Sequence, residues 1–337
     1  MERNAFFDNA KVLLIFLVVF GHLIQPFASE SLGIHTIYMW IYTFHMPAFI
    51  FLSGFFAKGS GNKKYIWNLA KKLLLPYLIF QMVYSGYYFF IGKSGLEFKI
   101  FHPQWALWFL FSLFCWHILL TVFKKIPASV GLLLTIAIGV GIGYFAEIGA
   151  EFSLSRTFAF FPFFLAGYWM NEERLSFLKL KSTKVLAVGV MAFVAVFMYM
   201  FPDLNSDWFL ASKSYETLGY PVMGGLLRVG VYTLAVVMSI SVLTFVPSTH
   251  NLFTSLGART LYVYLLHGFF IQYFREADLF YVNDFVDLIG LGLIAFGIVI
   301  FLSSKPIMRL GQPLVEGRFT KLRDFFKSRA HTMNTTS

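Results

Sequence analysis

The chain has 337 residues, of which 58% are hydrophobic and only 13% are charged, and its formal net charge is +10. A soluble domain of this size could not bury so much apolar surface, so the composition excludes an ordinary soluble protein. The single cysteine, Cys115, excludes an internal disulfide framework. The sequence therefore predicts an all-α integral membrane protein.

Apolar runs recur along the whole chain, and each is long enough to cross a hydrocarbon core of about 30 Å as a helix. They predict about ten transmembrane helices, at residues 12–27, 36–57, 73–91, 104–123, 128–145, 156–170, 185–201, 222–246, 260–274 and 285–303. The first run follows a charged segment and lacks a small-residue cleavage pattern after it. We therefore expect a retained span rather than a signal peptide.

The Lys and Arg residues are sorted between the two sides of these predicted spans. Of the 27 in the chain, six fall on one side: Lys93, Lys99, Arg156, Lys213, Arg228 and Arg275. The positive-inside rule assigns the richer side, and with it both termini, to the cytoplasm. We expect residues 1–304 to form a polytopic membrane domain and residues 305–337 a basic cytoplasmic tail. Acidic membrane lipid and nucleotide phosphate are then the predicted partners of the basic charge, and nucleic acid is not.

The first apolar run carries three ionisable residues on one helix face, namely Asp8, Lys11 and His22. A helix turns about 100° and rises about 1.5 Å per residue, so Lys11 and His22 share a face at a separation of about 16 Å. An ionisable group that faces lipid is costly, so this face is predicted to point into the protein or a water-filled cavity. It is the first candidate functional site.

Two further histidines are predicted at a similar depth. His45 lies about 14 Å below the outer surface in the second span, and His267 lies about 12 Å above the cytoplasmic surface in the ninth. Three imidazoles in one layer indicate that at least one has a chemical role. Imidazole binds zinc, but none of the three has a second histidine at helical spacing or a carboxylate beside it in sequence. We predict no metal site.

Two arginines and two tryptophans are expected toward the outer side. Arg156 can snorkel to the interface, whereas Arg228, about two turns inside its span, needs a cavity or a carboxylate partner. Trp105 and Trp108 are predicted on one face of the fourth helix, where they fit either an aromatic belt or a platform for a stacked sugar ring. Residues 202–221 form the longest external connection, which fits a solvated loop or a cap over an outward-facing site.

Several motifs combine along the chain. Lys11 precedes His22 by eleven positions, and the second span contains Phe44-His45-Met-Pro; further motifs lie at residues 72–77, 105–110, 156–167 and 264–267. Together they resemble the acyltransferase-3 family of bacterial membrane O-acyltransferases, particularly its branch similar to fucose acetylases. The resemblance covers nearly the whole chain.

The resemblance implies transfer of an acyl group, usually acetyl from cytoplasmic acetyl-CoA, to a hydroxyl of a sugar or cell-surface glycan at the bacterial inner membrane. His22 is implied as the general base, with a covalent acyl-histidine as the rival path. Lys11 and Asp8 are implied to orient the donor, although an ion pair at a helix start is an alternative for both.

The remaining implied sites lie on either side of His22. His45, Arg156, Arg228, His267 and Trp108 are candidates for acceptor binding or oxyanion stabilisation. Lys71 and Lys72 are candidates for holding the CoA phosphates. They depart from the family's frequent Arg-x-x-Arg pair, whose first position here is Leu69. If a second enzyme completes the transfer, it is a separate extracytoplasmic partner.

Two other classes of function fit parts of the sequence. A transporter or flippase for a sugar or lipid-linked saccharide would suit ten spans and a polar intramembrane layer equally well. No internal repeat of useful strength supports it. A membrane-embedded interaction or sensor protein is the third hypothesis, in which His22 would be replaceable without loss of chemistry.

Overall fold

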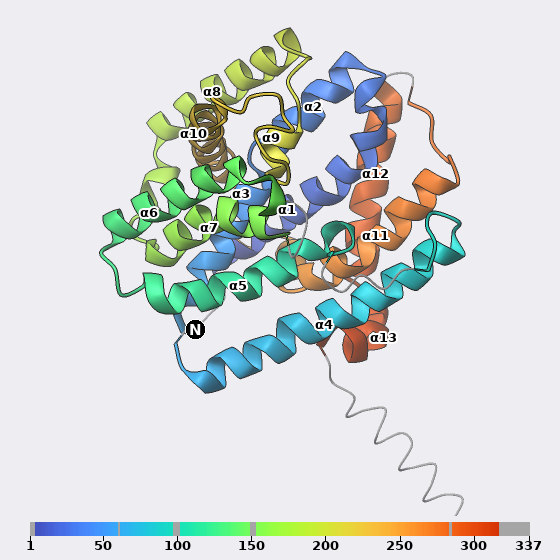
Figure 1. The fold of residues 1–337 in the computed structure, drawn as a ribbon. Coiled ribbons are helices and arrows are strands. Elements are labelled where there is room, and N and C mark those ends of the chain that lie inside the picture. Colours follow the sequence, from blue (N-terminus) through green and yellow to red (C-terminus); the bar gives the residue numbers. More distant parts are fainter. Residues whose placement is uncertain (1–3, 60, 97–101, 149–152, 283–284, 317–337) are drawn as a thin grey trace, which may run out of the picture.

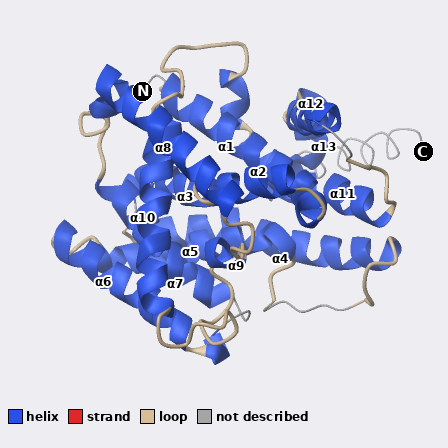
Figure 2. Ribbon diagram, turned by 90° about the horizontal axis from the view of Figure 1, so that it is seen from above, coloured by secondary structure: helices blue, strands red, loops and turns tan. Residues whose placement is uncertain are grey.

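The computed structural model describes residues 4–59, 61–96, 102–148, 153–282 and 285–316, and these ranges contain helices and no strand (Figures 1 and 2). The α-helices are α1 (Ala5–Ile24), α2 (Leu32–Tyr42), α3 (His45–Phe55), α4 (Lys63–Phe90), α5 (Trp108–Phe123), α6 (Ala128–Gly141), α7 (Leu154–Trp169), α8 (Lys181–Met200), α9 (Asp207–Leu210), α10 (Gly224–Leu243), α11 (Thr260–Glu276), α12 (Phe285–Leu302) and α13 (Lys305–Glu316). The predicted all-α class is confirmed for this part of the chain.

Six helical segments of the described residues are long and apolar enough to cross a membrane: Ala5–Ser29, Lys63–Phe90, Trp105–Phe123, Lys181–Met200, Gly224–Leu243 and Phe285–Leu302. The other predicted spans correspond to shorter helices, which are α2 with α3, α6, α7 and α11. The count of ten and the cytoplasmic position of both termini stay predictions.

The expected span over residues 36–57 is interrupted between α2 and α3. Pro47 accounts for the break, because it has no N–H to donate to the carbonyl of Thr43 and its ring crowds that turn. Phe44 accordingly leaves helical geometry, with φ −134° and ψ −26°. The kink makes His45 the first residue of α3, where its Nδ1 lies 2.9 Å from the carbonyl oxygen of Ile41.

Helix α1 packs against α2, α3, α11, α12 and the 3-10 turn η8 (Thr254–Ala258). Its first turn is capped by Asn4, whose side chain accepts a hydrogen bond from the backbone N–H of Phe6. The buried Asn9 donates to the carbonyls of Pro247 and Thr249, at 2.8 and 3.0 Å. It also accepts a hydrogen bond from the hydroxyl of Thr254. These bonds tie the connection between α10 and α11 to α1.

Helices α3 and α7 approach each other until their backbones touch. A Cβ added at Gly54 of α3 would collide with the carbonyl of Phe164, and one added at Gly167 of α7 would collide with the carbonyl of Phe51. Small residues permit such close crossings of membrane helices. Two glycines therefore hold α7 against the helix that begins at His45.

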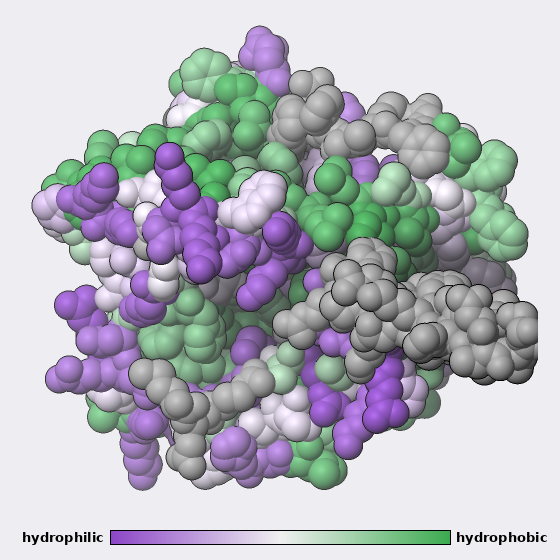
Figure 3. Space-filling view, turned by 90° about the horizontal axis from the view of Figure 1, so that it is seen from below, coloured by the Kyte–Doolittle hydropathy of each residue, from purple (hydrophilic) through white to green (hydrophobic). Residues whose placement is uncertain are grey.

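Large apolar side chains remain exposed on the surface of the helix bundle, as contact with lipid requires. Helix α8 shows this clearly, because Val185, Leu186 and Phe193 are each about two-thirds exposed. From below, apolar patches alternate with hydrophilic side chains (Figure 3).

The segment expected to be a tail begins with a helix. Helix α13 packs against α4, α11 and α12, and the hydroxyl of Tyr262 donates to Oε1 of Glu316 at 2.7 Å. Residues 317–337 of the expected tail, and Lys99 among the expected external cations, lie outside the described residues. At least the first twelve residues of the expected tail are helical.

Candidate active site

The imidazole of His22 lies among aromatic side chains from three other elements. Its ring centroid is 4.5 Å from that of Trp105 in the 3-10 turn η3 (Trp105–Leu107), and 5.7 Å from that of His267 on α11. Its Nδ1 is 3.3 Å from the hydroxyl oxygen of Tyr42, at the end of α2. His22 as a whole is half-buried.

The predicted layer of three histidines is present, with unequal contacts. The rings of His22 and His267 stack at an interplanar angle of 24°. The His45 ring packs instead on the ring of Tyr42, with those two centroids 4.6 Å apart, and the hydroxyl of Tyr42 in turn lies near His22. His267 is fully buried, and its Nδ1 lies 3.0 and 2.8 Å from the carbonyl oxygens of Val263 and Tyr264. Those carbonyls fix the proton on Nδ1. Its Nε2 has no hydrogen-bond partner among the described residues.

The sequence predicts Trp105 and Trp108 on one face of one helix, but α5 begins at Trp108 and Trp105 lies before it in η3, with a left-handed φ of 45°. The Trp105 ring packs on His22 and His267, whereas the Trp108 ring packs on Arg156 and Phe160. A Cβ at Gly268 would collide with the Trp105 ring, so this glycine permits the indole to lie against α11 beside His267. The amphipathic pattern could not show this turn, because the packing of Trp105 on α11 is a tertiary contact.

Two cavities meet at His22. The outer one, of about 380 Å³, lies beyond the end of α1 and is lined by His22, Gln25, Glu30, Arg275, Asp278 and by apolar side chains that include Phe27, Phe274 and Phe280. The inner one, of about 30 Å³, is lined by His22, by Val18 and Ile15 one and two turns earlier on α1, and by side chains of α3, α5 and α11. The imidazole therefore forms part of the wall of both.

Arg275 is a site residue that the sequence analysis placed only among the external cations. Pro26 has no N–H, so the carbonyl of His22, four residues earlier, loses its helical partner. Nη2 of Arg275 takes that place, donating to the carbonyl oxygen of His22 at 2.5 Å and to Oε1 of Gln25 at 2.9 Å. The proline four residues after His22 was the available signal.

Asp8 and Lys11 form the ion pair expected at the start of α1. Nζ of Lys11 is 2.7 Å from Oδ1 of Asp8 and lies 5.2 Å from the ring centroid of Phe56. Three helical turns separate Lys11 from His22, about 16 Å along α1. The structure therefore does not bring this pair into contact with the imidazole.

Arg156 and Arg228 both bind the backbone around α9. Nε of Arg156 donates to the carbonyl of Leu210 at 3.1 Å, and Nη1 of the buried Arg228 donates to the carbonyl of Trp208 at 2.6 Å. Arg228 also lies over the rings of Trp208 and Tyr215. A cavity or a carboxylate partner was expected for Arg228; its charge meets a carbonyl and aromatic faces, and the residue also lines a small cavity of about 10 Å³ with Tyr42 and Phe160. Together the two arginines dock the connection over residues 202–221.

The faces of Trp108 are covered in this conformation. The Arg156 guanidinium lies 5.1 Å from its ring centroid, and Phe160 stacks on it at 5.5 Å. The indole does line the inner cavity beside His22. A stacked sugar ring would have to displace Arg156 or Phe160.

The basic residues near the expected cytoplasmic side differ in availability. Lys71 and Lys72 of α4 are exposed, and Nζ of Lys71 lies 5.0 Å from the ring centroid of Trp67. Nζ of Lys58 instead donates to the carbonyls of Tyr168 and Met170, at 2.6 Å each, and so caps the end of α7. Desolvation, with a smaller contribution from Arg174, lowers the pKa of Lys58.

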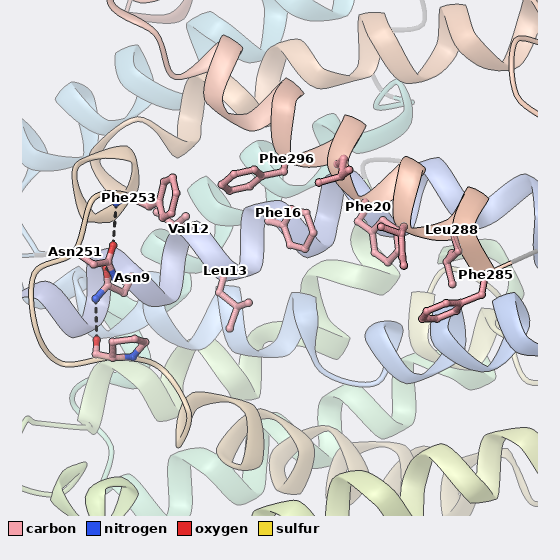
Figure 4. A pocket seen from close by; sticks show the side chains of 14 residues that line it. Asn9, Val12, Leu13, Phe16, Phe20, Asn251, Phe253, Phe285, Leu288 and Phe296 are labelled. Carbon is pink, nitrogen blue, oxygen red and sulfur yellow. Dashed lines mark hydrogen bonds between the residues drawn. The ribbon is translucent and has the colours of Figure 1, made fainter.

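A larger cavity of about 610 Å³ lies between α1, α12 and the connection before α11 (Figure 4). Its lining is apolar except for Asn9 and Asn251, and Asn9 is already bonded to the connection. Without a titratable group in its lining, this cavity offers no general acid or base. The chemistry is therefore assigned to the cavities at His22. The described residues contain no group of three or more His, Cys, Asp or Glu placed to hold a metal ion.

The fold and the site define a helical membrane protein with a half-buried histidine in the walls of two cavities. A family model described as an acyltransferase domain matches residues 4–304. The chain belongs to this family, acyltransferase-3, whose members are integral membrane proteins.

Individual relatives match over shorter stretches. Nodulation protein NolL of Mesorhizobium japonicum is 28% identical over 183 residues, which cover 50% of this chain and 48% of that protein. Nodulation protein NolL of Sinorhizobium fredii is 29% identical over 129 residues, covering 34% and 35%. The chain thus spans about half or less of the curated relatives it matches. No solved structure matches it.

Proposed function

We propose that this protein is a membrane-bound O-acyltransferase that moves an acyl group, with acetyl as the leading case, from cytoplasmic acyl-CoA to a hydroxyl of a sugar or cell-surface glycan. Family membership supports the reaction class. The observation that carries the mechanism is the position of His22 in the walls of both the outer and the inner cavity. A base at the junction of two routes can meet a donor and an acceptor that arrive from opposite sides.

The outer cavity has the groups that a sugar requires. Gln25, Glu30 and Asp278 offer amide and carboxylate atoms to hydroxyl groups, and Phe27, Phe274 and Phe280 offer apolar surface for the faces of a sugar ring. Its volume of about 380 Å³ lies within the usual range of small-molecule sites. We assign this cavity to the acceptor.

The inner cavity marks the approach of the donor. It follows α1 from His22 through Val18 and Ile15, toward the helix end that the charge pattern assigns to the cytoplasm. Lys71 and Lys72 are exposed on α4 and would bind the CoA phosphates as point charges. Asp8 and Lys11 lie on α1 toward the same end.

The reaction needs one proton acceptor. We assign to His22 the tautomer in which Nδ1–H donates to the Tyr42 hydroxyl, which leaves the lone pair on Nε2. Nε2 takes the proton of the sugar hydroxyl as its oxygen attacks the thioester carbonyl. The C–O bond forms, the C–S bond breaks, and the same proton passes from Nε2 to the leaving thiolate. The base is regenerated and no further reactant is consumed.

The test is acyl transfer by the His22→Ala protein, reconstituted with labelled acetyl-CoA and glycan acceptor. We expect loss of transfer of at least about a hundredfold. His117→Ala is the matched control, because His117 is a buried histidine of α5 whose Nδ1 also faces a tyrosine hydroxyl, that of Tyr65 at 3.2 Å. Unchanged transfer by folded His22→Ala would refute the mechanism. Movement of labelled saccharide without acylation would favour the transporter hypothesis.

The wider setting follows from the same proposal. The protein resides in a bacterial inner membrane with membrane lipid around its apolar helices, and the acceptor approaches from the outer side. The resemblance to the branch similar to fucose acetylases favours a saccharide as acceptor. A separate extracytoplasmic enzyme would act only if the acyl group is passed on after this step.

A further inference from the structure

Arg275 is fixed beside the reacting imidazole by the end of α1. It lies in the last turn of α11, eight residues after His267. Its Nη2 is held by the carbonyl of His22 and by Gln25, as described above. Because the guanidinium is planar and rigid, one fixed nitrogen restricts the position of the other two. The cation is therefore positioned relative to the peptide that carries the base.

The same guanidinium has an unused donor. Nε of Arg275 is buried and has no hydrogen-bond partner among the described residues, and Arg275 lines the outer cavity together with His22. Buried N–H groups are nearly always paired in folded proteins, so an unpaired one calls for an explanation. A group that forms during the reaction would provide the missing acceptor.

The guanidinium of Arg275 is also not paired directly with a carboxylate of the described residues. In the described part of the chain it forms no ion pair, although two carboxylates, those of Glu30 and Asp278, line the same cavity. The neighbouring Glu276 pairs instead with Lys93, at 3.0 Å. The guanidinium at the wall that His22 shares is thus not held in an ion pair.

Resting on the function proposed above, we propose that Arg275 is a catalytic residue that stabilises the oxyanion of acyl transfer. When the sugar oxygen bonds to the thioester carbon, the carbonyl π electrons move onto the carbonyl oxygen, and the hydroxyl proton moves to His22. Arg275 donates a hydrogen bond to that oxygen and keeps its own proton. The electrons return as the C–S bond breaks, and the thiolate takes the proton from His22.

The test compares Arg275→Gln and Arg275→Lys with Arg259→Gln. Arg259 is the matched control, because it precedes the same helix and likewise donates to a backbone carbonyl, that of Ser303 at 2.9 Å. We expect kcat of Arg275→Gln to fall about 10²- to 10³-fold, the usual effect of removing one oxyanion donor. KM for both substrates should change by less than about threefold. Arg275→Lys, which keeps the charge, should lie in between, and Arg259→Gln should keep wild-type kcat.

A second measurement separates this role from anchoring of α1. Added methylguanidinium should restore part of the kcat of Arg275→Ala while leaving its thermal unfolding midpoint unchanged. The proposal is overturned if Arg275→Gln keeps kcat within about threefold of wild type. It is also overturned if the fall in kcat follows a fall in the thermal unfolding midpoint and methylguanidinium restores no kcat to Arg275→Ala. If the wild-type protein transfers the acyl group and His22→Ala does not, either of these results refutes only the role of Arg275. Absence of acyl transfer by the wild-type protein would refute the proposed function itself.

Discussion

The Tyr42→Phe substitution tests whether the hydroxyl of Tyr42 sets the proton position of His22. Tyr42 is buried at 4% exposure, and its ring packs against those of Tyr38 and His45, with centroids 4.1 and 4.6 Å away. Phenylalanine keeps this ring packing and removes only the oxygen that lies 3.3 Å from Nδ1 of His22. The substitution therefore perturbs the base with little change in the core.

The size of the effect follows from one neutral hydrogen bond. Its net contribution is about 0.5–1.5 kcal/mol, which corresponds to about a two- to thirteenfold change in rate. Without Tyr42 as acceptor, His22 also populates the tautomer in which Nε2 carries the proton and cannot act as a base. We expect kcat to fall about tenfold, with KM for donor and acceptor nearly unchanged.

The assay is steady-state transfer from labelled acetyl-CoA by purified protein, with the thermal unfolding midpoint as a folding check. Tyr65→Phe is the matched control, because it removes a hydroxyl that lies 3.2 Å from Nδ1 of His117, outside the proposed site. Equal small losses in the two variants would show that the Tyr42 hydroxyl only stabilises the fold. Wild-type kcat in Tyr42→Phe would refute the assigned tautomer.

Three further outcomes are expected. Gly54→Ala should lower the free energy of unfolding by about 3 kcal/mol or more, because the added Cβ meets the backbone of α7. Gly189→Ala is its control in thermal unfolding and should be near neutral, because the space around its Cβ is open. Arg228→Met should cost about 2 kcal/mol and speed proteolysis within residues 202–221. Replacing Lys71 and Lys72 together by alanine should weaken CoA binding by about tenfold or less in a salt-dependent way, measured by titration calorimetry.

Each of these has a contradicting result. Equal unfolding midpoints for the two glycine variants would mean that α3 and α7 do not touch through their backbones. Unchanged proteolysis in Arg228→Met would mean that Arg228 does not dock the connection over residues 202–221. CoA binding that is unaffected by the double lysine substitution at low salt would remove both lysines from the donor site.

The helices were predictable because apolar runs and their flanking charges are local features of the sequence. The ion pair of Asp8 and Lys11 was open to prediction for the same reason, since helix geometry places residues three apart on one face. Predicting the layer of histidines required only the direction of each span and the depth of each histidine within it. His22 and His267 accordingly meet in the structure.

Contacts between distant segments were not predictable in this way. Arg156 and Arg228 bind carbonyls of a short helix that no periodicity marks, and Arg275 reaches a carbonyl 253 positions away in the chain. Prolines gave partial signals: Pro47 marks the break before α3, and Pro26 marks a carbonyl in need of a donor. Neither residue identifies its distant partner, because partner choice depends on how the helices pack.

The small size of the inner cavity bears on how a donor would reach His22. A cavity of about 30 Å³ has room for a few water molecules at most and none for the pantetheine arm of an acyl-CoA. If the proposed donor uses this route, side chains of α1, α3, α5 and α11 have to move apart to admit it. We would then expect the turnover rate to depend on a conformational step as well as on the chemistry.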